Sequence, residues 1–191
     1  MKKSIFSLVI ALVFANAQAT EPIKGDKKDI KVSESTVVWK GHKVTGSHEG
    51  TINLKSGHLE MANGKLTGGS FTVDMASIAC TDLEGEYKGK LEGHLKSDDF
   101  FGTANHPTAS FTMKQVAATG ADTYEITGDL TIKGKTHPIS FVMTVNGNKA
   151  MAELKVDRTK YGIEYKSASI FSALGDKAIY DEFDLNVALQ F

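Results

Sequence analysis

The sequence is short of cysteine and has no excess of charge of either sign, and both shortages limit what the protein can do. Cys80 is the only cysteine, so the chain cannot form an internal disulfide and must be stabilised by packing. A lone thiol without a CxxC partner is more typical of a small buried side chain than of a nucleophile. The formal net charge of −1 argues against the basic surface that nucleic acids attract. We therefore expect no nucleic-acid partner.

The sequence also lacks the motifs of common enzyme and metal sites. It has no GxSxG elbow, Walker loop or dinucleotide fingerprint, and its six histidines show no HxxxH spacing. We expect no catalytic residue, no metal ion and no cofactor. The enzyme alternative that stays open is an exported enzyme acting at a barrel mouth, with His48, Glu49 and Arg158 as participants.

The one long apolar run lies at the N-terminus. Lys2 and Lys3 precede an apolar run at residues 5–14, and Ala17-Gln18-Ala19 forms a small-x-small cleavage site. Polar residues follow too soon for the roughly 20 apolar residues of a membrane span. We predict a secretory signal peptide at residues 1–19 and a periplasmic or secreted mature protein. Residues 20–34 are charged and are expected to form an exposed lead-in to one domain at residues 35–191.

After residue 36, short apolar segments alternate with polar residues at a period of two, as in half-buried β-strands. The clearest segments are residues 111–113, 126–132, 139–145, 150–156 and 183–191, and weaker ones are 36–40, 47–55, 58–61 and 65–74. Asn63-Gly64 and Asn146-Gly147 separate strand candidates where hairpins need positive φ angles. These patterns predict an all-β fold, an antiparallel β-barrel of about eight strands whose closure removes exposed edges.

Residues 81–97 interrupt the strand pattern. Leu91 and Leu95 share one face of a helix, whereas three glycines at about 1 kcal/mol each disfavour the first half of the segment as helix. We predict a loop that leads into one short helix.

Arg158 stands out because every other basic residue that is not histidine is lysine. A planar guanidinium with five donors could clamp a carboxylate, such as Asp157 or one distant in sequence, or could bind an anionic ligand head. The clamp between strands is the favoured interpretation, and the ligand contact stays open.

Five ordered motifs resemble those of the YceI-like proteins, over essentially the whole chain after the signal peptide. They are LTGGSFTVDM at residues 66–75, GHLKSDDFF at 93–101, HPTASF at 106–111, GDLTIKG at 128–134 and DRTKYGI at 157–163. The resemblance implies a lipocalin-like antiparallel barrel with a helix packed near its mouth. It also implies a periplasmic protein without enzymatic activity that binds a polyisoprenoid or another long amphiphilic chain.

A barrel of this size can hold one elongated guest if its centre is not filled by side chains. The candidate ligand-binding residues are Trp39, Phe71, Phe111, Met113, Phe141, Met143, Phe183, Leu185 and Arg158. The predicted partner is a long-chain isoprenoid, an isoprenoid quinone or a fatty amphiphile, and a homodimer stays open. A second alternative is a small integral outer-membrane β-barrel, because the last strand alternates up to Phe191.

Overall fold

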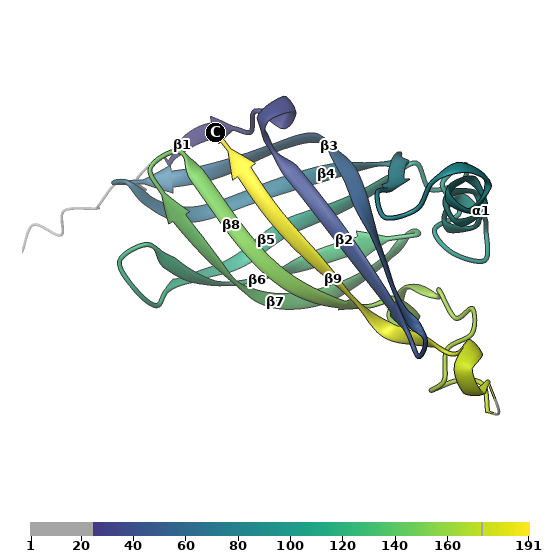
Figure 1. The fold of residues 1–191 in the computed structure, drawn as a ribbon. Helices are drawn as coiled ribbons and strands as arrows, with labels where there is room; N and C mark the ends of the chain where they lie inside the picture. The colour runs from purple at the N-terminus through teal and green to yellow at the C-terminus, as the bar shows by residue number, and fades with distance from the viewer. Residues whose placement is uncertain (1–24, 173) are drawn as a thin grey trace, which may run out of the picture.

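The computed structural model describes residues 25–172 and 174–191, and most of them lie in β-strands (Figure 1). The strands are β1 (Asp26–Asp29), β2 (Thr36–Lys43), β3 (Gly46–Ala62), β4 (Lys65–Cys80), β5 (Thr108–Ala118), β6 (Thr123–Ile132), β7 (Lys135–Asn146), β8 (Lys149–Asp157) and β9 (Ile179–Gln190). The helix is α1 (Gly85–Lys96), and the short 3-10 helices are η1 (Val32–Glu34), η2 (Arg158–Tyr161) and η3 (Gly175–Lys177). The predicted signal peptide at residues 1–19 lies outside the described residues.

The strands form a closed antiparallel barrel. Their order in the sheet is β1-β3-β2-β9-β8-β7-β6-β5-β4, and an additional pairing of β3 with β4 closes β2 to β9 into a ring of eight strands. This confirms the predicted fold class. Within the predicted lead-in, β1 lies outside the ring and pairs with residues 58–61 of β3, and the next residue, Ile30, is buried. Among the described residues, no helix is long and apolar enough to cross a membrane.

Period-two alternation decides which side chains fill the barrel. In β6, every second residue is buried, namely Tyr124, Ile126, Gly128, Leu130 and Ile132. The buried residues form two apolar clusters. One includes Leu95 and Phe100 beside α1, and the other includes Ile30 and Leu59 near β1. Because α1 and β1 lie at opposite ends of the barrel in Figure 1, the clusters divide the interior along its length.

Two strands are longer and less regular than the sequence predicts. Residues 47–55 and 58–61, predicted as separate strands, belong to the single strand β3, because the ladder with β4 continues through a register shift between Leu54 and Ser56. β4 continues past Asp74 to Cys80, and its ladder shifts again opposite residues 51–53 of β3. The Asp74 carboxylate accepts a hydrogen bond from the Ala76 N–H at 3.0 Å, which stabilises this bulge.

The helix α1 covers the barrel end at the right of Figure 1 and confirms the predicted short helix near the mouth. It begins at Gly85, earlier than predicted, and includes all three glycines. Tertiary contacts offset the weak intrinsic preference. Leu95 is buried against the barrel, and the Glu92 carboxylate accepts a hydrogen bond from the Cys80 N–H at 2.9 Å.

Candidate functional site

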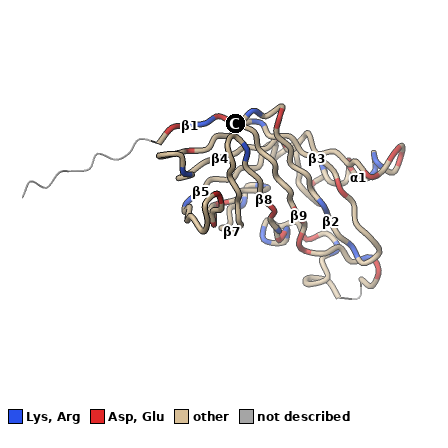
Figure 2. The backbone as a smooth tube through the Cα atoms, turned by 60° about the vertical axis from the view of Figure 1, so that its left-hand side comes forward, with Lys and Arg blue, Asp and Glu red and all other residues tan. Residues whose placement is uncertain are grey.

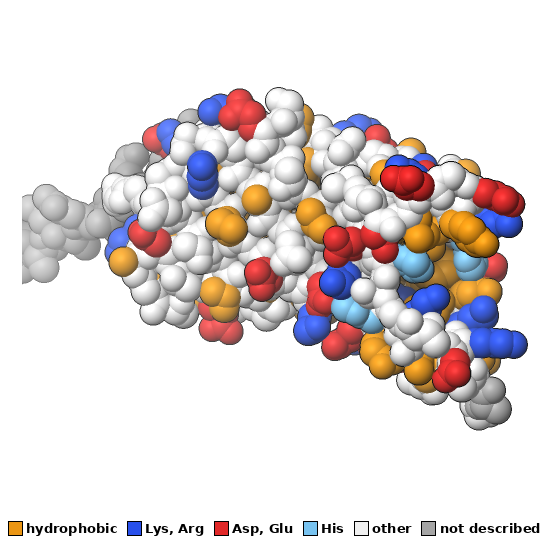
Figure 3. All heavy atoms as spheres, viewed as in Figure 1, with side chains coloured by type: hydrophobic (Ala, Val, Ile, Leu, Met, Phe, Trp, Pro, Cys, Tyr) orange, Lys and Arg blue, Asp and Glu red, His pale blue; other side chains and the backbone are white. Residues whose placement is uncertain are grey.

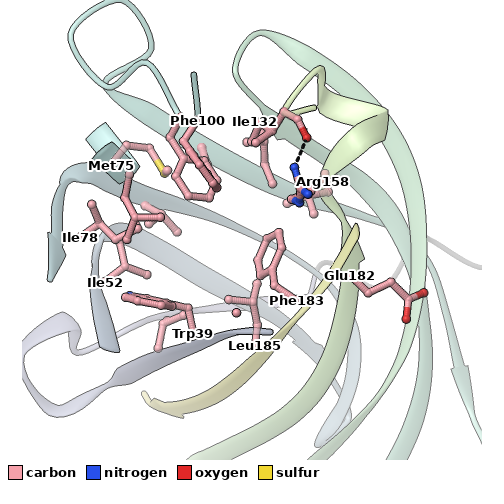
Figure 4. Close-up of a pocket in the computed structure, with 18 of the residues that line it drawn as sticks. Trp39, Ile52, Met75, Ile78, Phe100, Ile132, Arg158, Glu182, Phe183 and Leu185 are labelled. Atoms are coloured by element: carbon pink, nitrogen blue, oxygen red, sulfur yellow. Dashed lines mark hydrogen bonds between the residues drawn. The ribbon is translucent and has the colours of Figure 1, made fainter. Parts of the chain in front are cut away.

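The barrel end next to α1 contains a cavity, which we call the mouth cavity. Its atom-free space, including the part open to solvent, is about 900 Å³. In Figure 4, Trp39, Ile52, Met75 and Ile78 form one wall, and Phe183 projects into the space from β9. The residues that line it are mostly apolar, so the space suits a hydrocarbon rather than a polar solute.

A second cavity, the inner cavity, lies deeper in the barrel. Its atom-free space is about 590 Å³, and all the residues that line it are apolar. Four residues line both cavities: Val37, Val73, Leu130 and Leu185. The two cavities are therefore neighbours. The Phe111 and Phe141 rings, 5.3 Å apart, line the inner cavity and are only partly buried, because empty space adjoins them inside the barrel.

The predicted ligand-binding residues are divided between the two cavities. Trp39, Phe183, Leu185 and Arg158 line the mouth cavity, whereas Phe71, Phe111, Phe141, Met143 and Leu185 line the inner cavity. Met113 lines neither cavity, since its side chain is buried in the core, where it is the neighbour of Gly69. Their positions in the two cavities do not test ligand binding, so contact between these residues and a ligand stays a prediction.

Sequence reasoning missed several cavity residues, above all Met75 and Ile78 on β4. Both are buried and both line the mouth cavity, although they are three positions apart in the sequence. Strict alternation would place them on opposite faces, and the bulge in β4 brings both inward. Phe100 and Phe101, which follow α1, also line the cavity. The apolar pair at the end of the GHLKSDDFF motif was the available signal for them.

Arg158 is a buried clamp at the edge of the mouth cavity. Its side chain is only 4% exposed, and it donates hydrogen bonds to three backbone carbonyls: Nη1 to Ile163 at 2.7 Å, Nε to Tyr180 at 3.0 Å and Nη2 to Ile179 at 3.0 Å. Burial lowers the pKa of the guanidinium from its ordinary value, and the charges of Asp181 and Asp157 oppose this. The guanidinium holds β9 against the segment after η2 and thereby fits the favoured structural interpretation.

The carboxylate that pairs with Arg158 is Asp181, with Oδ1 3.6 Å from Nη2. Asp157 instead caps η2, where Oδ1 accepts a hydrogen bond from the Thr159 N–H at 3.0 Å. Burial alone would raise the pKa of Asp181. Hydrogen bonds from Ser167 and Ser169 and the charge of Arg158 together lower this pKa by more, so it lies below its ordinary value. Asp181 is therefore ionised at neutral pH.

The side chains of the three residues of the enzyme alternative each have a different charged partner. His48 Nδ1 lies 3.0 Å from the Asp82 carboxylate, Glu49 pairs with Lys40 at 3.6 Å, and Arg158 pairs with Asp181. Within residues 25–172 and 174–191, no group of three or more His, Cys, Asp or Glu residues could hold a metal ion.

Cys80 is fully buried, and its thiol donates a hydrogen bond to the Asp82 carboxylate at 3.0 Å. Burial raises the pKa of this thiol, and the bond to Asp82 raises it further. A thiol that stays protonated is a poor nucleophile, which agrees with the structural role predicted for Cys80.

Two bacterial relatives match part of this chain in sequence. A UPF0312 protein of Pseudomonas putida is 29% identical over 150 residues, which cover 77% of this chain and 74% of that protein. A UPF0312 protein of Azotobacter vinelandii is 35% identical over 79 residues, 37% of this chain and 41% of that protein.

Two solved structures have the same fold at low sequence identity. Burkholderia cenocepacia BcnA matches with a TM-score of 0.66 and 23% identity, covering 84% of this chain and 98% of that one. A polyisoprenoid binding domain from Saccharophagus degradans, implicated in plant cell wall breakdown, matches with a TM-score of 0.58 and 15% identity, covering 87% and 97%. The YceI-like domain model matches residues 29–191, and the chain belongs to this family.

Proposed function

We propose that this protein is an exported carrier that holds one long apolar or amphiphilic molecule inside its barrel. The observation that carries the proposal is the pair of adjoining cavities, which share Leu185 and three other apolar residues and extend from the mouth into the barrel. A flexible hydrocarbon chain is the kind of guest that can occupy both.

Burial of the chain would supply the binding energy. Each CH₂ group transferred from water into an apolar interior contributes about 0.8 kcal/mol, so affinity should increase with every carbon that the cavities admit. The inner cavity has no polar lining that would have to lose its hydration first. Met143 and Met75 are flexible side chains that can adapt to a chain without a fixed shape.

The ligand classes that fit are a polyisoprenoid, an isoprenoid quinone and a fatty amphiphile. The neighbour from Saccharophagus degradans is described as a polyisoprenoid binding domain, which supports the isoprenoid class for this chain.

The polar residues on the outer face of the barrel support a barrel that is surrounded by water rather than by lipid. The exposed positions of β7 include Lys135, Thr136, Ser140 and Thr144, whereas an outer-membrane barrel turns an apolar band toward lipid.

Trp39 provides a direct test, because it is the only tryptophan and lines the mouth cavity. The protein should be stripped of bound lipid and titrated with farnesol and with longer polyprenols while the emission of Trp39 is followed. We expect saturable changes in emission and tighter binding of longer chains. A flat titration with all chain lengths would contradict the proposal. Native mass spectrometry of the untreated protein would identify a co-purifying lipid.

A matched pair of glycine variants locates the binding. A Cβ on Gly41 would meet no heavy atom within 4 Å, and Gly41 lines the mouth cavity, so Gly41→Leu should fill the cavity without distorting the fold. Gly89 on α1 has equally open surroundings and lines neither cavity. We expect Gly41→Leu to weaken farnesol binding about tenfold or more and Gly89→Leu to leave it unchanged.

Export is the second part of the proposal and rests on residues 1–19 of the sequence. Cleavage before Thr20 predicts a mature chain that begins with Thr20 and Glu21. Osmotic-shock fractionation should release the protein without detergent, and the mass of the released chain should correspond to this cleavage. Recovery only in the membrane pellet would favour the membrane-barrel alternative.

A further inference from the structure

Large apolar side chains are exposed at the mouth end of the barrel. Four of them, which we call the mouth rim, are Val44, Ile170, Phe171 and Tyr180, and each is between 45% and 54% exposed. Val44 lies in the turn between β2 and β3, the next two lie in the loop between η2 and η3, and Tyr180 is the second residue of β9. In Figure 3, hydrophobic side chains gather among lysines at the right-hand end of the molecule. Clustered apolar surface with polar residues around it is typical of an interaction site.

The segments that carry the mouth rim are joined to one another by backbone hydrogen bonds. The Val44 N–H donates to the Ala178 carbonyl at 3.3 Å, and the Ile179 N–H donates to the Lys166 carbonyl at 2.9 Å. Residues 167–171 form a turn whose ends are joined by a hydrogen bond of 2.9 Å. In Figure 1, the β2–β3 hairpin and this loop project together from the lower right of the barrel. The mouth rim therefore belongs to one end of the molecule.

The mouth rim adjoins the mouth cavity. Tyr180 belongs to the rim and also lines the cavity, as does Ile163 at the start of the loop. Tyr165, farther along the loop, packs against the ring of Phe100 with 5.7 Å between the ring centroids, and Phe100 lines the cavity too. Apolar surface thus continues from the cavity to the rim.

The charges beside the mouth rim largely cancel. Residues 43–47 and 163–182 carry three lysines, Lys43, Lys166 and Lys177, and four carboxylates, Glu164, Asp176, Asp181 and Glu182. Asp181 pairs with the buried Arg158, with 3.6 Å between Oδ1 and Nη2, which leaves three carboxylates for the three lysines. Figure 2 shows charges of both signs near the β2–β3 hairpin. Attraction to this surface must therefore come from its apolar side chains rather than from net charge.

The form of the mouth rim suits a lipid surface. Val44 and the pair Ile170 and Phe171 lie on separate turns, whereas a second copy or another folded protein would need a broad complementary face. Tyr180 combines an apolar ring with a polar hydroxyl, a combination that is enriched where hydrocarbon meets water. Lysines beside such side chains can bury their stems and extend their ammonium groups toward lipid phosphates. A balanced set of charges also matches the zwitterionic heads of phospholipids.

We infer that the mouth end of the barrel docks on a phospholipid bilayer, with the mouth rim inserted among the lipid heads and the opening of the mouth cavity against the lipid. A long hydrocarbon guest could then pass between the bilayer and the cavity without exposing its CH₂ groups to water. The purpose of docking rests on the proposed function, whereas docking itself can be measured without a guest.

Co-sedimentation with vesicles of phosphatidylcholine tests the docking. We expect the lipid-free protein to sediment with the vesicles, and an increase in salt from about 0.1 M to about 1 M to change the affinity by less than about twofold, because apolar insertion is not screened. The double variant Ile170→Ser, Phe171→Ser should bind the vesicles about tenfold more weakly or worse. The matched control is Val142→Ser, Met151→Ser, which replaces two apolar side chains that are 54% and 63% exposed on β7 and β8, and it should bind unchanged.

Three results would overturn the inference: no binding of the native protein, equal loss in both double variants, or binding that high salt abolishes. Self-association of the native protein that Ile170→Ser, Phe171→Ser abolishes, without vesicle binding, would instead assign the mouth rim to a second copy. Farnesol titration of Trp39 emission without vesicles keeps the two claims apart. A normal farnesol response without vesicle binding overturns the docking alone, whereas the absence of that response overturns the proposed function.

A site-specific label tests the orientation. Phe171→Cys can carry a polarity-sensitive dye, since the natural Cys80 is buried, and Met151→Cys on β8 is the matched control. We expect vesicles to shift the emission of the dye at residue 171 to shorter wavelength and to leave the dye at residue 151 unchanged. A shift at both residues, or at residue 151 alone, would overturn docking through the mouth end.

Discussion

At the scale of single residues, Arg158 supplies hydrogen bonds to backbone carbonyls at the start of β9. Ile179 and Tyr180 lie before the first pair of the β8–β9 ladder, Asp157 with Glu182, and the guanidinium donates to the carbonyls of both. A lysine ammonium is a point donor on a flexible stem and cannot reach three carbonyls in one plane. The rarity of arginine indicated a special role, but its carbonyl partners depend on where the ladder between β8 and β9 ends, which the alternation of the sequence does not reveal.

We predict that Arg158→Lys lowers the free energy of unfolding by about 3 kcal/mol, because buried carbonyls and the Asp181 carboxylate lose their partner. Urea denaturation followed by circular dichroism measures the change. Lys160→Arg, on the exposed side of the same 3-10 helix, is the control and should be neutral. Loss of ligand binding with unchanged stability would contradict the structural role.

Asp181 makes stability depend on acid pH. Its pKa in the folded protein lies below the ordinary value of 3.8, so its ionised form stabilises the fold. This contribution is fully present above the unfolded pKa and is lost as the pH falls below about 4 through the folded pKa. We predict that Asp181→Asn is less stable at pH 7 and that its free energy of unfolding falls less steeply below pH 4. Chemical denaturation at a series of pH values tests this, and parallel curves for both proteins would contradict it.

At the scale of elements, glycine has opposite roles at two positions of the β2–β3 hairpin, Gly50 on β3 and Gly41 on β2. Gly50 pairs with Trp39, and a Cβ on Gly50 would lie 1.8 Å from the Ala79 carbonyl oxygen and 2.7 Å from the Trp39 ring. The missing side chain allows β4 to approach and the indole to donate to the Ala79 carbonyl at 3.2 Å. Gly41 instead adjoins open space.

We predict that Gly50→Ala destabilises the protein by about 3 kcal/mol, since the clash is with backbone that cannot move alone. Gly41→Ala should change stability by no more than about 0.5 kcal/mol. Thermal unfolding of the two variants compares them directly. Similar losses would show that backbone entropy rather than close approach decides the cost of replacing these glycines.

The regular segments of the strands could be predicted from the sequence, whereas the bulged segments could not. β6 and β7 follow strict alternation, so their inward residues, such as Ile126 and Met143, could be predicted. The register shifts in β3, β4 and β9 depend on contacts with strands that are distant in sequence. The alternation of apolar and polar residues therefore does not predict these shifts. The shift in β4 places both Met75 and Ile78 in the mouth cavity, and the shift in β9 lies next to Gly41 at its edge. The five predicted aromatic residues line the two cavities, whereas Phe100, Phe101 and the shape of the cavities were not predicted.

At the scale of the whole molecule, the barrel leaves interior space that a core built only for stability would fill. Unfilled volume costs about 24 cal/mol per Å³ when side chains are removed from a packed core. Closure of the ring by β3 and β4 fixes the strands around this space and keeps the interior from collapsing. The protein should therefore be more stable with a chain bound than without, by an amount that increases with ligand concentration.

A larger side chain at Ala152 on β8 would reduce the volume of the inner cavity and leave the mouth cavity unchanged. It is buried, lines the inner cavity and does not line the mouth cavity. We predict that Ala152→Leu raises the melting temperature of the lipid-free protein, because the added carbons fill empty apolar space. It should also weaken the binding of long polyprenols and leave farnesol binding unchanged, since a short chain fits within the mouth cavity alone. Met151→Leu, at a neighbouring residue that is 63% exposed, is the control for both measurements. Equal loss of affinity for short and long chains would mean that the ligand does not extend from one cavity into the other.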